Sequence, residues 1–149
     1  MKLQIGIDSP KKFEVEDLLN FLGEELKIKD NVELIVAYNN SLLNRLSTED
    51  IEYKALLHSP LPNYYVLYVK ENVYNLHYIL CHELVHLEQY ERGDLKISND
   101  FSTVTWKGVT YTKEYPYTDR EWEDEAFRLE TKLWKKFKKK LKQDQNERD

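Results

Sequence analysis

Apolar and polar residues follow two different spacings along this chain, and the two spacings predict different secondary structures. Alternation with a period of two, in segments rich in β-branched and aromatic residues, predicts β-strands. These strands are expected at 3–7, 32–38, 64–70, 101–106 and 109–113. Apolar residues that recur every three or four positions predict helices over 9–26, 49–57, 73–91 and about 118–141. Because the predicted strands and helices are interspersed along the chain, we expect a single α+β domain over 1–149.

Turn and capping residues support some of these boundaries. Thr48 is a suitable N-cap for the helix at 49–57, and Pro60 and Pro62 would bring that helix to an end. Asn39-Asn40 is expected to form a turn after the strand at 32–38. Lys107-Gly108 is expected to turn a hairpin between the last two strands.

The helix at 73–91 contains the motif His82-Glu83-Leu84-Val85-His86, which reads H-E-x-x-H. Residues four positions apart lie one above the other on a helix, so both imidazoles should project from one face. Four leucines fall on the other side, about 120° to 200° around the helix from His82. They are Leu76, Leu80, Leu84 and Leu87. We therefore expect the leucines to anchor the helix in the core while the histidines face a cleft.

Two imidazoles on one helix face, with a glutamate beside them, suit a divalent metal ion and most often zinc. Catalytic zinc usually has three protein ligands and one open position for water. No histidine follows His86 and Met1 is the only methionine, which excludes the metzincin pattern. A downstream carboxylate is the natural third ligand. The last predicted helix offers Glu121, Glu123, Glu125 and Glu130, and its wide apolar arc does not choose among them.

An H-E-x-x-H helix followed some tens of residues later by a helical Glu125-Ala126 resembles the gluzincin class of zinc metallopeptidases. It is most similar to the small members from phage and prophage genomes and to the minigluzincins. The resemblance covers about 64–133 and implies a zincin-like fold, in which a small mixed or antiparallel sheet packs on the motif helix and a C-terminal glutamate helix. It also implies that Glu125, directly before a small residue, is the third ligand, with Glu121 or Glu123 as alternatives.

The activity implied by this resemblance is zinc-dependent hydrolysis of peptide bonds. His82, His86 and Glu125 would hold Zn²⁺, and Glu83 would act as the general base that takes a proton from the attacking water. The strand at 64–70, expected at the sheet edge, would pair with an extended substrate peptide. Candidates for an additional transition-state donor are Tyr111, Tyr115 and Tyr117.

Two alternatives belong to other classes of protein. The first is a metal-stabilised binding or regulatory protein of the same fold with little hydrolytic activity, in which Glu83 would not matter for turnover. The second is an interaction protein without a metal, in which the motif is a coincidence.

Composition, net charge and cysteine content indicate the class of protein, its partners and its expected location. Hydrophobic residues make up 41% and charged residues 33% of the chain, as in soluble globular domains. A net charge of −5 argues against nucleic acid as the main partner. The resemblance implies a protein or peptide substrate. Cys81 is the only cysteine, so an internal disulfide is excluded. The sequence shows neither a signal peptide nor a membrane span, which predicts a cytoplasmic protein, encoded by a cell or a phage. Oligomeric state stays open.

Three other features have ordinary structural interpretations. His77 lies about 140° around the helix from His82 and is not expected to join the same site, and His58 is expected to be structural or exposed. Cys81 is expected to be a small buried apolar residue. The lysines of 135–140 are expected to form a solvated face near a helix C-terminus, where positive charge favours the helix dipole.

Overall fold

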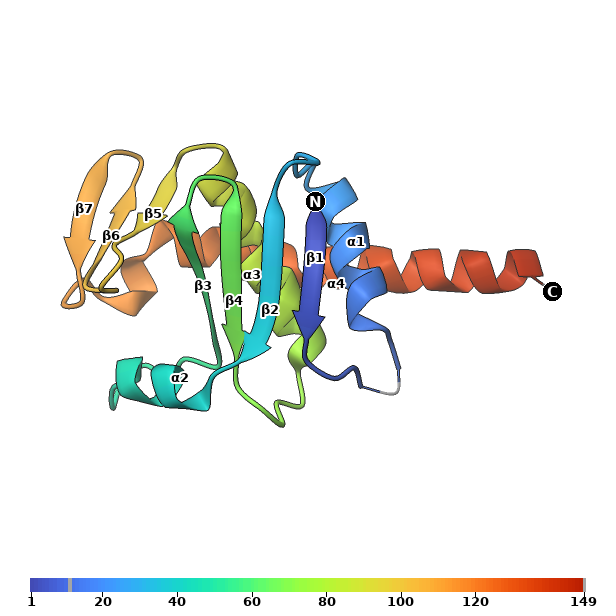
Figure 1. The fold of residues 1–149 in the computed structure, drawn as a ribbon, viewed down its shortest axis with the longest axis horizontal. Coiled ribbons are helices and arrows are strands. Elements are labelled where there is room, and N and C mark those ends of the chain that lie inside the picture. The colour runs from blue at the N-terminus through green and yellow to red at the C-terminus, as the bar shows by residue number, and fades with distance from the viewer. Residues whose placement is uncertain (11, 149) are drawn as a thin grey trace.

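In the computed structural model, which describes residues 1–10 and 12–148, the chain forms two β-sheets and four α-helices. The larger sheet has the strand order β1-β2-β4-β3 (Figure 1). Its parallel strands are β1 (Lys2–Gly6), β2 (Glu33–Tyr38) and β4 (Tyr64–Val69). Strand β3 (Ala55–Leu61) runs antiparallel to β4 at one edge of the sheet. The fold is therefore α+β with a mixed sheet.

Three helices cover one face of this sheet (Figure 1). They are α1 (Val15–Glu25), α3 (Leu76–Glu91) and α4 (Glu121–Arg148). Apolar residues of α1 at the spacing of one helix face, Leu18 and Leu22, are fully buried, as are Leu67 of β4 and Leu84 of α3. Helix α4 crosses α3 and then projects past the sheet toward the C-terminus (Figure 1). This packing fixes α3 and α4 against each other and so positions their side chains.

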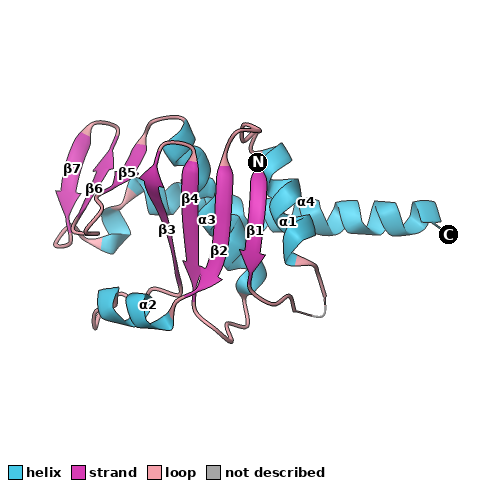
Figure 2. Cartoon of the chain, in the orientation of Figure 1, coloured by secondary structure: helices cyan, strands magenta, loops and turns pink. Residues whose placement is uncertain are grey.

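A smaller antiparallel sheet lies beyond the β3 edge (Figure 2). Its strands, in order, are β5 (Leu95–Ile97), β6 (Thr103–Trp106) and β7 (Val109–Thr112). Leu95 and Trp106 of this sheet pack with Trp122 in a second apolar cluster, which ties the sheet to the start of α4. The predicted hairpin is confirmed, whereas β5 is a short strand that the pattern did not predict.

Most of the other predicted elements are also confirmed, with shifted ends. The strands at 3–7, 32–38 and 64–70 correspond to β1, β2 and β4. The first helix begins at Val15 rather than at Ser9, whose hydroxyl oxygen accepts from the Val15 N–H at 2.8 Å. The last helix follows a 3₁₀ turn, Tyr117–Asp119. No helix in the described part of the chain is both long and apolar enough to cross a membrane.

The predicted helix at 49–57 is wrong. The helix in this region is α2 (Asn40–Leu46), and its N-cap is Asn39, whose Oδ1 accepts from the Leu42 N–H at 3.0 Å. Thr48 closes a local turn instead, accepting from the Ile51 N–H at 3.1 Å. The residues that follow form β3, because pairing with β4 outweighs their local helix propensity. Pro60 is tolerated there because it lies at the register shift between His58 and Leu61.

The expected position of the strand at 64–70 also needs correction. Strand β4 is paired with β2 on one side and with β3 on the other. Its backbone groups are therefore used inside the sheet, and it has no free edge for a peptide. The strand at the edge nearest α3 is β3, whose first three residues, 55–57, the sequence pattern assigned to a helix.

Candidate metal centre

Helix α3 holds the two histidines of the motif on one side, where it meets α4. The ring centroids of His82 and His86 are 4.8 Å apart, and both residues are buried, with exposed fractions of 8% and 7%. Leu80, Leu84 and Leu87 of the same helix are fully buried in the core. The predicted division of this helix between an apolar face and a histidine face is confirmed.

A carboxylate from the first turn of α4, that of Glu123, completes the cluster. Its Oε1 atom lies 2.6 Å from Nε2 of His86, and its Oε2 atom lies 3.2 Å from Nε2 of His82. One ligand atom from each side chain lies within 4.8 Å of the others. Both histidines thus direct the same ring nitrogen toward one carboxylate. This buried group could hold a metal ion, and two imidazoles with one carboxylate form a donor set that zinc uses.

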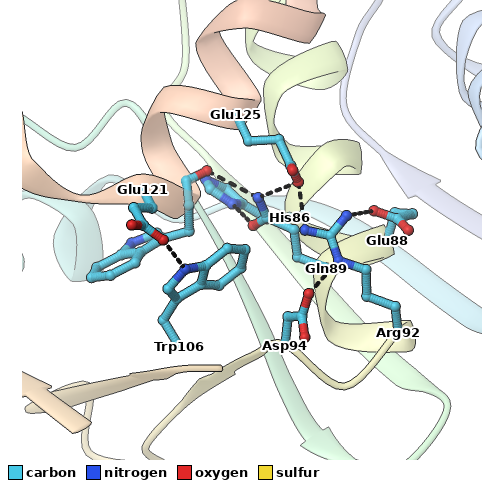
Figure 3. A network of polar contacts seen from close by, with 9 residues as sticks. His86, Glu88, Gln89, Arg92, Asp94, Trp106, Glu121 and Glu125 are labelled. Carbon is cyan, nitrogen blue, oxygen red and sulfur yellow. Dashed lines mark hydrogen bonds and ion pairs between the residues drawn. The ribbon is translucent and has the colours of Figure 1, made fainter. Parts of the chain in front are cut away.

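Glu125, the ligand implied by the family resemblance, lies outside this group. Its Oε1 atom accepts from Nη2 of Arg92 at 2.7 Å and from Nε2 of Gln89 at 3.0 Å (Figure 3). Glu121 is also engaged elsewhere, because its Oε2 accepts from Nε1 of Trp106 at 2.9 Å (Figure 3). The carboxylate that lies with the two histidines is therefore that of Glu123, and not that of the expected Glu125.

The position of Ala126 explains why Glu123 faces the histidines. Ala126 is fully buried, and a small side chain there lets α4 approach α3 closely. Residues three before and four after a contact point share its helix face, whereas the residue directly before it lies about 100° away. Glu123 and Glu130 stand at these spacings from Ala126, and Glu125 is its direct neighbour. The small residue thus marks the face of the site, and its preceding glutamate points away from it.

The three groups of the cluster strongly perturb one another's protonation. Burial alone would lower the pKa of His82, but hydrogen bonds with Glu123 and Glu130 outweigh it and raise that pKa to about 10. Burial likewise opposes the charge of His86, and attraction by Glu123 raises its pKa. Burial would raise the pKa of Glu123, but the two histidines hold it well below its usual range. A metal ion must therefore displace protons from the imidazoles when it binds.

Glu83 lies beside the cluster with its side chain almost completely buried, at 9% exposure. Burial raises the pKa of its carboxyl group, while the two histidines and a hydrogen bond from the Leu57 backbone N–H act in the opposite direction. A raised pKa makes a buried carboxylate a stronger base than an exposed one. The structure thus places the buried carboxyl group of Glu83 beside the two histidines.

One of the three candidate tyrosines reaches the cluster. The Tyr117 hydroxyl donates to Oε2 of Glu123 at 2.6 Å. Burial raises the pKa of Tyr117, and the negative charge of Glu123 raises it further, so the hydroxyl keeps its proton. Tyr111 and Tyr115 pack against each other with tilted rings instead, their centroids 4.3 Å apart.

The cluster opens into a cleft of about 1070 Å³. Its walls come from β3, from the hairpin β6–β7 and from the segment before α4, and the two histidines and Glu83 line its floor. The ring of Phe127, which is 49% exposed, lies over His82 with centroids 4.6 Å apart.

Two further residues hold the histidines from behind: Glu130 was among the candidate ligands, whereas Gln89 was not predicted. Oε1 of Gln89 lies 2.7 Å from Nδ1 of His86, and Oε2 of Glu130 lies 3.7 Å from Nδ1 of His82. Gln89 could have been found from its spacing, since it lies one helical turn after His86 on the same face. Glu130 shares the face of Ala126, as described above.

The remaining histidines lie elsewhere, as expected. His77 packs between Tyr78 and Trp134, with ring centroids 4.3 and 4.4 Å away. His58 is buried against Phe101, with centroids 4.8 Å apart. Cys81 is buried, and burial raises the pKa of its thiol to about 12, so it is an inert apolar residue.

Comparisons of this chain with known protein families, with curated proteins and with solved structures found no match. The function of the site is therefore inferred from its own geometry and chemistry.

Proposed function

We propose that this protein is a small zinc-dependent metallopeptidase of the gluzincin type. The observation that carries the proposal is the convergence of Nε2 of His82 and Nε2 of His86 on the buried carboxylate of Glu123. A motif helix under a mixed sheet, joined by a later glutamate helix, is the arrangement that the family resemblance implies and supports the same conclusion.

The chemistry follows from the residues around the proposed ion. His82, His86 and Glu123 would hold zinc, which when bound polarises a carbonyl and lowers the pKa of a nearby water molecule. Glu83 accepts the proton of that water as it attacks the peptide carbonyl, and then delivers the proton to the leaving amine. The Tyr117 hydroxyl can donate a hydrogen bond, without losing its proton, to the carbonyl oxygen as negative charge develops there, once the hydroxyl leaves Glu123.

Strand β3 is the proposed docking edge for the substrate. The carbonyl of Lys54, the residue before β3, accepts from the N–H of Lys70, the residue after β4, at 2.9 Å, and so these two residues form a hydrogen-bonded pair. In an antiparallel pair, hydrogen bonding alternates from residue to residue, so Ala55 and Leu57 direct their backbone groups away from β4. Leu57 meets Glu83 there, and the edge continues along the cleft wall past Ala55. An extended peptide can add to this edge with its carbonyl close to Glu83.

The first test is the zinc content per chain, measured by elemental analysis after purification without added metal. We expect about one zinc in the wild type, clear loss in Glu123→Ala, and retention in the matched control Glu125→Ala. Loss in Glu125→Ala with retention in Glu123→Ala would contradict the ligand set. A wild type that takes up no zinc, even when it is offered, would refute the metal centre.

The second test concerns hydrolysis. Glu83→Gln should keep zinc and lose cleavage of unfolded proteins and peptide libraries, because the amide cannot accept the proton of water. Cleavage at the wild-type rate would refute the role of Glu83. Zinc binding by a wild type that cleaves none of these substrates would favour the metal-stabilised binding protein instead.

A further inference from the structure

Gln89 is a buried polar residue at the contact between α3 and α4. Its exposed fraction is 0%, and it lies one helical turn after His86. An amide in such a position is retained without penalty only when its donors and acceptor are hydrogen-bonded. Gln89 meets this condition through three contacts, with His86, Trp122 and Glu125.

These contacts fix the orientation of the amide. Nε2 of Gln89 donates to the Trp122 carbonyl oxygen at 3.0 Å and to Oε1 of Glu125 at 3.0 Å. Both partners are acceptors, so this end of the amide must be the NH₂ group. The oxygen of the amide therefore faces Nδ1 of His86, 2.7 Å away (Figure 3). Since an amide oxygen only accepts, Nδ1 of His86 must carry the proton.

From this we infer that Gln89 is a positioning residue that keeps the proton of His86 on Nδ1 and so reserves Nε2 for a metal ion. The inference rests on the proposed function as far as the metal is concerned. A neutral imidazole has one protonated and one free nitrogen, and only the free one can bind a metal. By accepting a hydrogen bond from Nδ1, Gln89 leaves Nε2 as the free nitrogen of the neutral ring, and it also orients the plane of the ring toward Glu123.

Glu125 and Arg92 act as the outer anchor of this arrangement. Arg92 contacts Oε1 of Glu125 at 2.7 Å, and it is itself held by Glu88 at 2.9 Å and Asp94 at 2.7 Å (Figure 3). Because the carboxylate of Glu125 is held in place, it keeps the NH₂ group of Gln89 turned toward itself and the amide oxygen turned toward the imidazole of His86. The glutamate before Ala126 thus supports a ligand from behind, through Gln89.

The test compares the wild type with Gln89→Met, which keeps the size of the side chain and removes its polar atoms. In metal-free protein labelled with ¹⁵N-histidine, at a pH high enough to make the His86 ring neutral, the ¹⁵N shifts should show a protonated Nδ1 and a free Nε2, and Gln89→Met should lose this preference. The zinc affinity of the folded protein should fall by roughly 10–100-fold in Gln89→Met. Val85→Ala, a buried change on the same helix, is the control for general loss of stability and should keep both properties.

A second variant separates positioning from packing. In Gln89→Glu/Glu125→Gln the carboxylate and the amide exchange places. Nδ1 of His86 again has an acceptor and the amide at position 125 can donate to that carboxylate, while the Trp122 carbonyl oxygen loses its donor. We expect this double variant to regain the Nδ1 proton and part of the zinc affinity that Gln89→Met loses, whereas Glu125→Gln alone should not improve on the wild type.

Two results would overturn the inference: a bare Nδ1 on His86 in the wild type, or wild-type zinc affinity in Gln89→Met. Failure of the proposed function gives a different pattern. If the wild type binds no zinc or cleaves no peptide, the proposed function fails. The position of the His86 proton can still be measured in the metal-free protein, and that measurement decides the role of Gln89.

Discussion

Removing the carboxylate of Glu123 should destabilise the metal-free protein much more than removing that of Glu125. The Glu123 side chain is only 13% exposed and contacts two imidazoles and the Tyr117 hydroxyl at 2.6 to 3.2 Å. At pH 7 the His82 imidazole holds a proton against it, since the pKa of His82 is about 10, and attraction by Glu123 raises the pKa of His86 in the same direction. The Glu123→Ala change leaves these buried groups without their counter-charge.

The structure gives a magnitude for each change. Breaking a buried ion pair by removing one partner costs about 3–5 kcal/mol. At roughly 2–4 °C per kcal/mol for a chain of this size, the melting temperature should fall by about 6 °C or more. The side chains of Glu125 and Arg92 are 23% and 33% exposed, and water screens their pairing. Gln89 also keeps its bond to the Trp122 carbonyl, so Glu125→Ala should cost only about 1–2 kcal/mol.

The assay is urea unfolding followed by circular dichroism at pH 7, with a chelator present for every variant. Glu121→Ala, which loses one hydrogen bond from Trp106, is a third variant of the same helix turn and should cost about 1 kcal/mol. If Glu125→Ala is as costly as Glu123→Ala, the rotation of α4 against α3 differs from that described here and the ligand assignment fails.

Three further predictions concern pH, catalysis and substrate binding. The metal-free protein should lose stability as the pH rises from about 6.5 to 10, because folding raises the pKa of His82 from 6.5 to about 10 and the proton held in the folded state is lost in this window. Thermal melts should show that the stability of Glu123→Gln depends less on pH than that of the wild type. An equal pH dependence in the two proteins would contradict the ion pair. Tyr117→Phe should lower kcat for peptide hydrolysis by roughly 10²–10³-fold with zinc content unchanged; an unaltered kcat would remove Tyr117 from the mechanism. Ala55→Pro should raise KM severalfold with little effect on kcat, because it removes a backbone N–H from the free edge of β3; steady-state kinetics with extended peptides that show an unchanged KM would place the substrate elsewhere.

Local sequence patterns were sufficient where neighbouring residues decide the structure. The leucine spacing of α3 and the H-E-x-x-H spacing both act within a few helical turns, so the division of this helix was predictable. The pattern failed at 49–57, where Ala55–Leu61 forms a strand. Residues 55–57 are compatible with a helix, and their pairing with β4, which follows in the chain, makes them part of a strand.

The sequence by itself determined that His82 and His86 project together, with Glu83 beside them, because a helix of any length places residues four apart on one face. It did not determine the third member of the cluster. Glu121, Glu123 and Glu125 are all on α4, and the one that meets the histidines depends on the rotation of α4 about its axis. That rotation comes from tertiary packing, in which Ala126, Leu133 and Phe137 are buried against the rest of the core. A difference of two residues turns a side chain by about 200° around a helix, and this separates Glu123 in the cluster from Glu125 in its outer support.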